Sequence, residues 1–247
     1  MLPLFDLAAV KVICEIRNFD ASSMPAPVQR GLNRNESIIR LQDAAINLVR
    51  EFPPEPCFVF DRHGFINAKK TLQNAEKHLN PITLFIYHMT MGLADELPKV
   101  WKKCHGFGQD HLLNSGCLLV RYFAEMCDYE QSNPSYDTLN LCVHALEHRM
   151  DDLFFYFFQK CQPSEQSYLT VVRIVRILKT VHHRDFGYEC RQLRKQIRLN
   201  VKVSQPHIEE VMMHCTDWDR RRFFTLPKDC QVPEIAEYLT SWFKRSE

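Results

Sequence analysis

Two segments of this chain repeat the pattern of a short helix, a tight turn and a second short helix. They cover residues 81–104 and 136–161, and apolar residues recur in each at helical spacing. A lone pair of helices of two or three turns cannot bury its apolar face, whereas stacked neighbours bury a continuous core. The sequence therefore predicts an all-α fold of stacked helix pairs. With 7 glycines in 247 residues, it also lacks the glycine turns of a β-sandwich.

Three further stretches lie before the first of these segments. Residues 3–19 carry an apolar stripe at helical spacing, and the Ser- and Pro-rich run 22–27 ends that helix. A second helix is expected over residues 36–52, ended by the Pro-Pro pair that follows, because proline lacks a backbone donor and disfavours helix in the residue before it. The apolar run 57–60 has no evident partner strand, so we expect a packed loop there.

The composition excludes several classes of protein. Lys and Arg number 31 and Asp and Glu 30, so the overall charge gives no argument for nucleic acid. Charged residues interrupt the apolar positions of residues 1–19, which fits neither a signal peptide nor a membrane span. The ten cysteines lie ten or more residues apart, too far for a Cys-x-x-Cys zinc or redox motif. We expect reduced, buried thiols in an intracellular protein, cytoplasmic with the nucleus as the alternative, and without a cofactor.

The last residues carry the most informative pattern. Pro233 opens a segment in which Ile235, Tyr238, Leu239 and Trp242 fall three, four and seven residues apart, so they share one face of a helix. No sequence remains after it to cover that face. Such an end either docks on its own domain or is offered to a partner, and we expect the Tyr, Leu and Trp side chains to face outward.

This pattern, Pro-x-Ile-x-x-Tyr-Leu-x-Ser-aromatic, resembles the end of a SOCS box, the module that attaches proteins to elongin B/C and a cullin-5 scaffold. The resemblance implies that Pro233, Ile235, Tyr238 and Leu239 contact the cullin. It also implies a C-terminal module of three helices, which we expect over residues 183–247.

The upstream half of a SOCS box is a helix that inserts a leucine and a cysteine into elongin C. By resemblance, Phe186, Cys190 and Leu193 take this role, with Phe186 where the family has leucine. Arg194 stands where the family has an aliphatic residue, and Cys190 lies 43 residues before Pro233, farther than the family's layout. The segment 211–215 is an alternative frame with better spacing, but it lacks the arginine that follows the cysteine in the first frame.

The two helix-pair segments resemble degenerate ankyrin repeats. In the first, Thr83 and Gly92 stand at the family's separation and Phe85 at its leucine position, while the Pro and His of the motif are replaced. In the second, four apolar residues fit the pattern without a glycine at the turn: Leu139, Cys142, Phe154 and Phe155. Generic helical-repeat packing is the alternative. We expect a helical region over residues 1–60 and a helical-repeat domain over 61–182.

Two other patterns carry alternative chemistry. His144, Glu147 and His148 match the His-x-x-Glu-His motif of inverted zinc peptidases. Zinc needs a third ligand, and no convincing one follows, so we expect a pair of half-buried helix histidines and no bound metal.

A basic face covers residues 171–202, where Asp185 and Glu189 are the only acids. It is a candidate nucleic-acid or phosphopeptide surface, but the simpler expectation is a solvated face, or one paired with the acidic patches near Glu209 and Asp217. Its basic residues are Arg173, Arg176, Lys179, Arg184, Arg191, Arg194, Lys195, Arg198 and Lys202.

These observations favour a non-catalytic protein, since no glycine-rich phosphate loop or nucleophile motif is present. The resemblances imply a substrate-recognition adaptor of an elongin B/C–cullin-5 ubiquitin ligase, whose helical repeats capture an unknown substrate protein. The alternative is a helical scaffold or nucleic-acid-binding protein that uses the basic 171–202 face.

Overall fold

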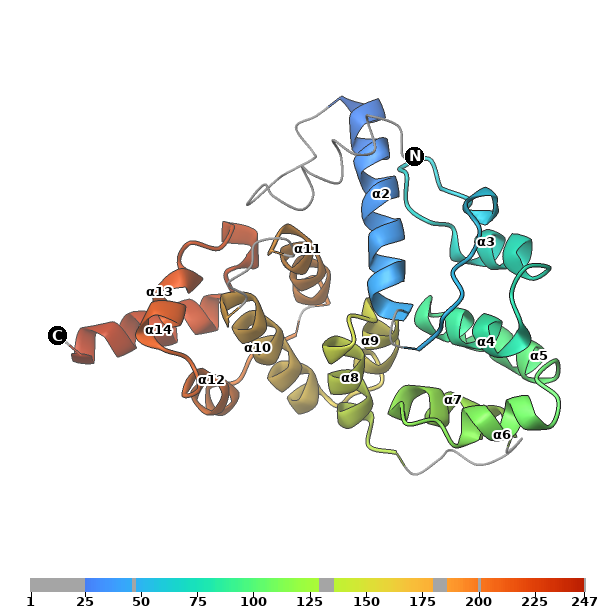
Figure 1. Ribbon diagram of the computed structural model, residues 1–247. Helices are drawn as coiled ribbons and strands as arrows, with labels where there is room; N and C mark the ends of the chain where they lie inside the picture. Colours follow the sequence, from blue (N-terminus) through green and yellow to red (C-terminus); the bar gives the residue numbers. More distant parts are fainter. Residues whose placement is uncertain (1–24, 46–47, 129–135, 180–185, 200, 247) are drawn as a thin grey trace. The chain divides into compact units, whose positions relative to one another are not determined.

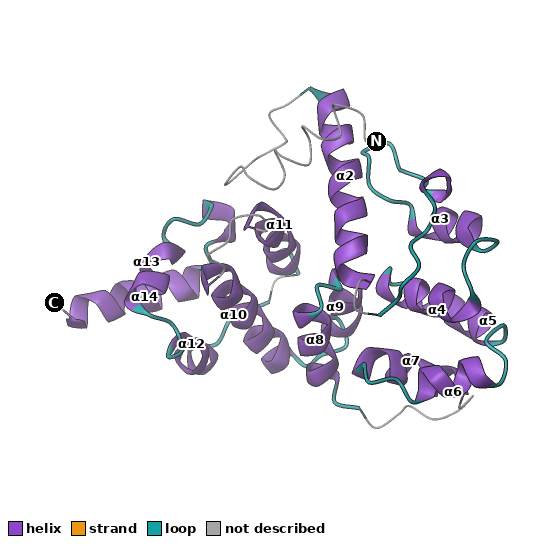
Figure 2. Ribbon diagram, viewed as in Figure 1, coloured by secondary structure: helices purple, strands orange, loops and turns teal. Residues whose placement is uncertain are grey.

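The computed structural model describes residues 25–45, 48–128, 136–179, 186–199 and 201–246 (Figure 1). Regular structure in these ranges is helical, as Figure 2 shows, apart from one antiparallel bridge between Phe60 and Ile66. The prediction of an all-α fold is confirmed. The helix expected over residues 3–19 lies outside the described residues. Among the helices that are described, none is both long and apolar enough to cross a lipid bilayer.

The described residues up to Lys160 form one compact unit, unit 1, and those from Cys161 onward form a second, unit 2. The α-helices of unit 1 are α2 (Ala26–Ala45), α3 (Ala68–Ala75), α4 (Pro81–Thr90), α5 (Leu97–Trp101), α6 (Phe107–Leu113), α7 (Leu118–Asp128), α8 (Thr138–Glu147) and α9 (Asp151–Phe158). Two 3-10 turns join them, η2 (Glu55–Cys57) and η3 (Ala94–Glu96).

Helix α4 is the centre of unit 1 and contacts α2, α3, α5, α6, α7 and α9 (Figure 1). It begins where Asn80 accepts a hydrogen bond from the backbone N–H of Thr83, with Pro81 in the first turn, where a missing N–H costs nothing. Its Phe85 and Met89 are fully buried. Helix α4 is therefore apolar on nearly all sides because neighbours cover it on nearly all sides.

The first described helix differs from the prediction. The expected helix over residues 36–52 begins ten residues earlier, at Ala26, and α2 ends at Ala45. Proline is tolerated in the first turn of a helix, so Pro27 lies within α2 instead of preceding it. The run 57–60 has no partner strand among the described residues and forms the packed loop that we expected, with one bridge at Phe60.

The two helix-pair segments both form hairpins of helices. Gly92 follows α4 with φ of 71°, a left-handed conformation that glycine adopts without strain. The second hairpin turns at Arg149, also with positive φ, and packs α8 against α9, where Cys142 Sγ donates to the carbonyl of Phe154. This pairing is a property that ankyrin repeats share with other helical repeats.

Unit 2 contains α10 (Pro163–Lys179), α11 (Phe186–Ile197), α12 (Gln205–Met212), α13 (Asp217–Phe223), the 3-10 turn η4 (Lys228–Cys230) and α14 (Pro233–Ser246). Helix α10 packs against α11, α12 and α13, and α14 packs against α12 (Figure 1). One apolar core joins these helices, with Ile174, Ile177 and Phe223 fully buried in it.

The boundary between the units differs from the predicted domains. We expected a repeat domain over residues 61–182 and a module over 183–247, but α10 belongs with the C-terminal helices. The reason is that the buried face of α10 supplies Val171, Ile174, Ile177 and Leu178 to the core of unit 2. Residues 25–60, expected as a separate region, are part of unit 1.

Candidate functional site

The C-terminal helix α14 begins at Pro233, as its sequence predicts. Ile235 and Leu239, one turn apart, are fully buried in the core of unit 2, whereas Tyr238 is half-buried and Trp242 is 36% exposed. The expectation that Leu239 faces outward is therefore wrong. An amphipathic helix buries the centre of its apolar stripe when its own domain offers a core, and here Tyr238 and Trp242 lie at the edge of that stripe.

The residues carried over for elongin C lie in the same core. Cys190 and Leu193 on α11 are buried, and Phe186 packs against them. Cys230 Sγ donates to the backbone carbonyl of Cys190. Contact with Cys230 and burial raise the pKa of the Cys190 thiol, so this side chain is a neutral core group. The structure thus brings the two predicted contact sets together as packing partners.

In the alternative frame, residues 211–215, most of the side chains are also buried. Val211, Met212 and Cys215 are buried in the core, while Met213 and His214 point to solvent at the end of α12. A leucine-and-cysteine insertion into elongin C from either frame would require these core side chains to leave unit 2.

A group of aromatic and arginine side chains lies on α13, on the residue after it and on α14 instead. Arg220 is buried within this group, and the other members are exposed or partly exposed. We call the group the aromatic surface, and it consists of Arg220, Arg221, Phe224, Tyr238, Trp242 and Phe243. The ring centroids of Phe224 and Phe243 are 6.5 Å apart, and those of Tyr238 and Trp242 are 6.4 Å apart. The guanidinium of Arg221 lies 4.8 Å from the ring centroid of Phe243. Trp, Tyr and Arg are the side chains that most often dominate binding energy at protein interfaces.

The start of α13 is firmly anchored. Thr216 and Asp219 form a capping box, in which each side chain bonds the backbone N–H of the other residue. Within α13, Arg220 donates to the Asp217 carboxylate and to the carbonyl of Met212, the last residue of α12. These contacts fix the position of Arg220 beneath the aromatic surface.

A groove adjoins the aromatic surface between α12 and α14, with a volume of about 720 Å³. Tyr238 and Trp242 belong to both features. Three carboxylates line the groove, from Glu209, Glu234 and Glu237, together with the cation of Arg245. The excess of carboxylates and the two aromatic rings favour a cationic group over an anionic one.

The basic 171–202 face is largely paired within unit 2. Arg173 is fully buried, and its Nη1 lies 3.2 Å from Glu189 Oε2. Arg176 Nε lies 3.7 Å from the other oxygen of the same carboxylate. Arg194 Nε lies 2.6 Å from Asp229 Oδ2. These three arginines are thus paired within unit 2, but the partners, Glu189 and Asp229, differ from the expected acidic patches near Glu209 and Asp217. Arg184 lies outside the described residues.

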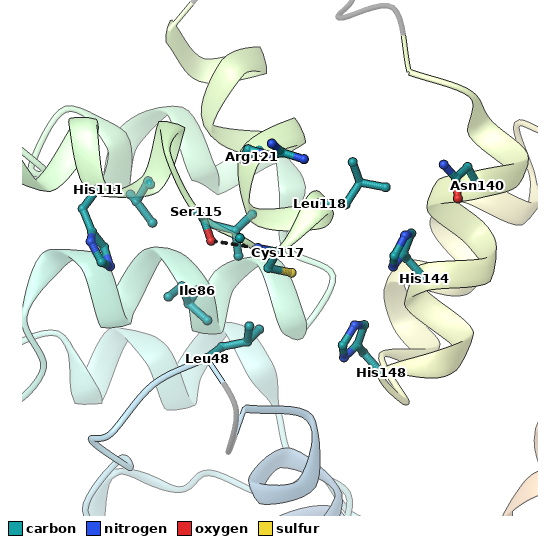
Figure 3. Close-up of a pocket in the computed structure, with 13 residues that line it drawn as sticks. Leu48, Ile86, His111, Ser115, Cys117, Leu118, Arg121, Asn140, His144 and His148 are labelled. Atoms are coloured by element: carbon teal, nitrogen blue, oxygen red, sulfur yellow. Dashed lines mark hydrogen bonds between the residues drawn. The ribbon is translucent and has the colours of Figure 1, made fainter.

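The histidines of the zinc-like motif stack on α8. The rings of His144 and His148 are nearly parallel, with centroids 6.2 Å apart. Both line a pocket of unit 1 together with Cys117 and Arg121 (Figure 3). In the described part of the chain, no three His, Cys, Asp or Glu residues gather closely enough to hold a metal ion. The pair therefore offers hydrogen-bond donors and acceptors to this pocket.

Sequence reasoning missed two of these features. The aromatic surface depends on the run of arginines and aromatics over residues 217–224, and its spacing next to a Thr-x-x-Asp cap was a usable signal for a helix that displays both. The pocket depends on α7 lying against α8, a tertiary contact without a local sequence signal.

Comparisons with protein-family models, with curated proteins and with solved structures found no match to this chain.

Proposed function

We propose that this chain is a non-catalytic adaptor that joins a substrate protein to an elongin B/C–cullin-5 ubiquitin ligase. The observation that carries the proposal is the aromatic surface, with Tyr238 and Trp242 accessible at the end of a helix that matches the SOCS-box pattern. Accessible Trp and Tyr side chains beside arginines have the chemistry of an interface hot spot.

The motif residues would have different roles, depending on whether their side chains are accessible or buried. Pro233, Tyr238 and Trp242 are at least partly accessible and would contact the ligase, with Pro233 also starting α14. Ile235 and Leu239 would act indirectly, because they hold α14 on the core of unit 2. Cys190 and Leu193 have the same indirect role, with Phe186 packed beside them, so elongin C would meet the outer surface of unit 2.

Unit 1 would capture the substrate. Its helix hairpins, α4 with α5 and α8 with α9, are the segments that resemble ankyrin repeats, and such stacks bind proteins through exposed positions of the repeats. Holding a substrate lysine near the charged ligase raises its effective concentration, which is the whole of an adaptor's contribution to the rate. This mechanism needs no catalytic residue or cofactor in the chain, and it would operate in the cytoplasm.

A nucleic-acid-binding function has less support. Two arginines of the 171–202 face, Arg173 and Arg176, contact the same carboxylate, that of Glu189. Binding to phosphates through that face would leave Glu189 without its partners in a buried position, which is costly. Strongly salt-dependent binding to RNA or DNA would favour this alternative over the adaptor.

Co-purification tests the adaptor function. The full chain would be co-expressed with elongin B/C and the cullin-5 scaffold, as the wild type and as the double variant Tyr238→Ala, Trp242→Ala. We expect the wild type to retain the ligase subunits at moderate salt and the double variant to lose them. Met213→Ala, which removes an exposed apolar side chain from the end of α12, is the matched control.

The double variant must keep its helical circular dichroism and its melting temperature, so that loss of the partner reports the surface and not the fold. Leu239 is left unchanged for this reason. Retention of the ligase subunits by the folded double variant, or their absence from the wild type, contradicts the proposal.

A further inference from the structure

The pocket of unit 1 has the composition of a ligand site that the adaptor function does not use. It lies between α4, α6, α7 and α8 and has a volume of about 610 Å³, within the range of small-molecule sites. Figure 3 shows His144 and His148 projecting from α8 toward the segment before α7 that carries Cys117. The site is independent of unit 2 and of the proposed ligase contact.

The polar groups around this pocket favour an anion. Arg121 projects from α7 into the gap between α7 and α8 (Figure 3), and its Nε is buried without a hydrogen-bond partner among the described residues. A buried guanidinium N–H without an acceptor is costly, and a ligand oxyanion would supply one. Asn140 and the two histidines add further donors on the opposite wall. None of the described side chains that line the pocket is acidic.

The start of helix α7 also favours an anion in this pocket. Ser115 Oγ accepts a hydrogen bond from the backbone N–H of Cys117, and α7 begins at the next residue, Leu118. The lining includes Leu118, Val120 and Arg121, so the N-terminal turn of this eleven-residue helix borders the pocket. Free backbone N–H groups and the helix dipole make such an end attractive to anions.

The remaining wall is apolar. It is formed by the side chains of Leu48, Ile86, Leu112, Leu118 and Val120. A bare inorganic ion would leave this surface in contact with water, whereas an apolar group attached to the anion would cover it. The ligand should therefore carry an anionic group and an apolar group.

We propose that the pocket binds an oxyanion, a phosphate monoester or a carboxylate, attached to a compact apolar group such as an aromatic ring. Arg121 pairs with the oxyanion, His144 and His148 donate hydrogen bonds to it, and the apolar group rests on Ile86 and its neighbours.

Calorimetric titration of the full chain with phenyl phosphate, benzoate and phenol tests the proposal. Phenyl phosphate and benzoate separate the two anion classes, and phenol carries the ring without a full charge. We expect at least one anion to bind and phenol to bind about tenfold more weakly or not at all. Arg121→Gln should weaken anion binding about tenfold or more, whereas Lys102→Gln, which removes an exposed charge of unit 1, should change it less than about twofold.

A second measurement remains informative if Arg121→Gln fails to fold. In nuclear magnetic resonance spectra of the wild type, the bound anion should shift the backbone amide signals of Gly116, Cys117 and Leu118 and the ring signals of His144 and His148. Binding of phenol as tight as that of both anions, unchanged anion binding in Arg121→Gln, shifts confined to other regions, or no binding by either anion would overturn the proposal.

Discussion

The guanidinium carbon of Arg220 lies 4.2 Å from the centroid of the Trp242 indole. The same guanidinium donates to Asp217 and to the carbonyl of Met212, so one side chain ties the end of α12, the start of α13 and the indole of α14 together. Trp242 is thus held against a fixed cation while part of its ring remains accessible. A ring positioned in this way loses little conformational entropy on binding, which favours its use as an interface anchor.

Replacing Arg220 should weaken unit 2 more than replacing its neighbour. Arg220→Ala removes a charge-assisted hydrogen bond to a buried carbonyl and the stack on Trp242, and we expect a loss of about 2 kcal/mol in the free energy of unfolding. Arg221→Ala removes an exposed cation from the ring of Phe243 and should cost less than about 1 kcal/mol. Urea unfolding monitored by tryptophan fluorescence compares the two variants. Equal losses would show that the contacts of Arg220 do not stabilise the helix arrangement.

Adjacent residues of the Tyr-Leu motif should behave differently. Leu239 is fully buried, so Leu239→Ala should leave a cavity and cost about 2–5 kcal/mol. Tyr238 is half-buried at the edge of the core, and Tyr238→Ala should cost clearly less. Thermal unfolding of both single variants measures the difference. If Leu239→Ala melts at the wild-type temperature, the helix α14 does not pack as described.

The ion pair between Arg173 and Glu189 is another specific source of stability. Both side chains are buried, so Glu189→Ala removes the Glu189 carboxylate from the buried Arg173 cation and should cost about 3–5 kcal/mol. The double variant Arg173→Met, Glu189→Leu should recover much of that loss, because it buries no charge. A double-mutant cycle from urea unfolding gives the coupling energy. A cost below about 1 kcal/mol for Glu189→Ala would contradict a buried pair.

The thiols of unit 1 give a pH-dependent prediction. Burial raises the pKa of the Cys104 thiol from 9.0 to about 11, and burial, with a smaller contribution from Cys104, raises that of Cys127 to about 12. The folded state therefore holds these protons more tightly than the unfolded state. Their contribution to stability is fully present below pH 9.0 and is lost as the pH rises to about 11 to 12.

Alkylation measures the same shift directly. Near neutral pH, Cys104 should react about a hundredfold and Cys127 about a thousandfold more slowly in the native protein than in urea-unfolded protein, since the thiolate is the reactive form. Peptide mapping by mass spectrometry assigns the rate to each cysteine. Similar rates in the native and unfolded protein would contradict the burial of these side chains.

Local sequence signals predicted the helices better than the contacts between them. The all-α fold follows from apolar periodicity, and Pro233 marked the start of α14 because proline fits the first helical turn. The predicted start of α2 was wrong for the same physical reason: the run 22–27 predicts a break, but Pro27 fits the first turn of α2. The partner of Arg173 was not predicted, because Glu189 comes from the next helix of the fold and carries no local signal.

The candidate site shows the same difference between local sequence signals and contacts between helices. The sequence identified the motif residues of α14 but not which of them are accessible, because burial of Leu239 depends on the core that α10, α11 and α12 provide. The aromatic surface needs α13 and α14 together, and the pocket needs α7 and α8 together. Sites built from two helices become visible only when their packing is known.

Direct measurement of affinity tests the central claim most sharply. The full chain would be titrated by calorimetry into an assembled elongin B/C–cullin-5 complex, as the wild type, as Trp242→Ala and as the control Met213→Ala. We predict saturable binding by the wild type and the control, and binding by Trp242→Ala that is weaker by about thirtyfold, the loss typical of a hot-spot residue. No binding by the wild type, or equal affinity for Trp242→Ala, would contradict the account.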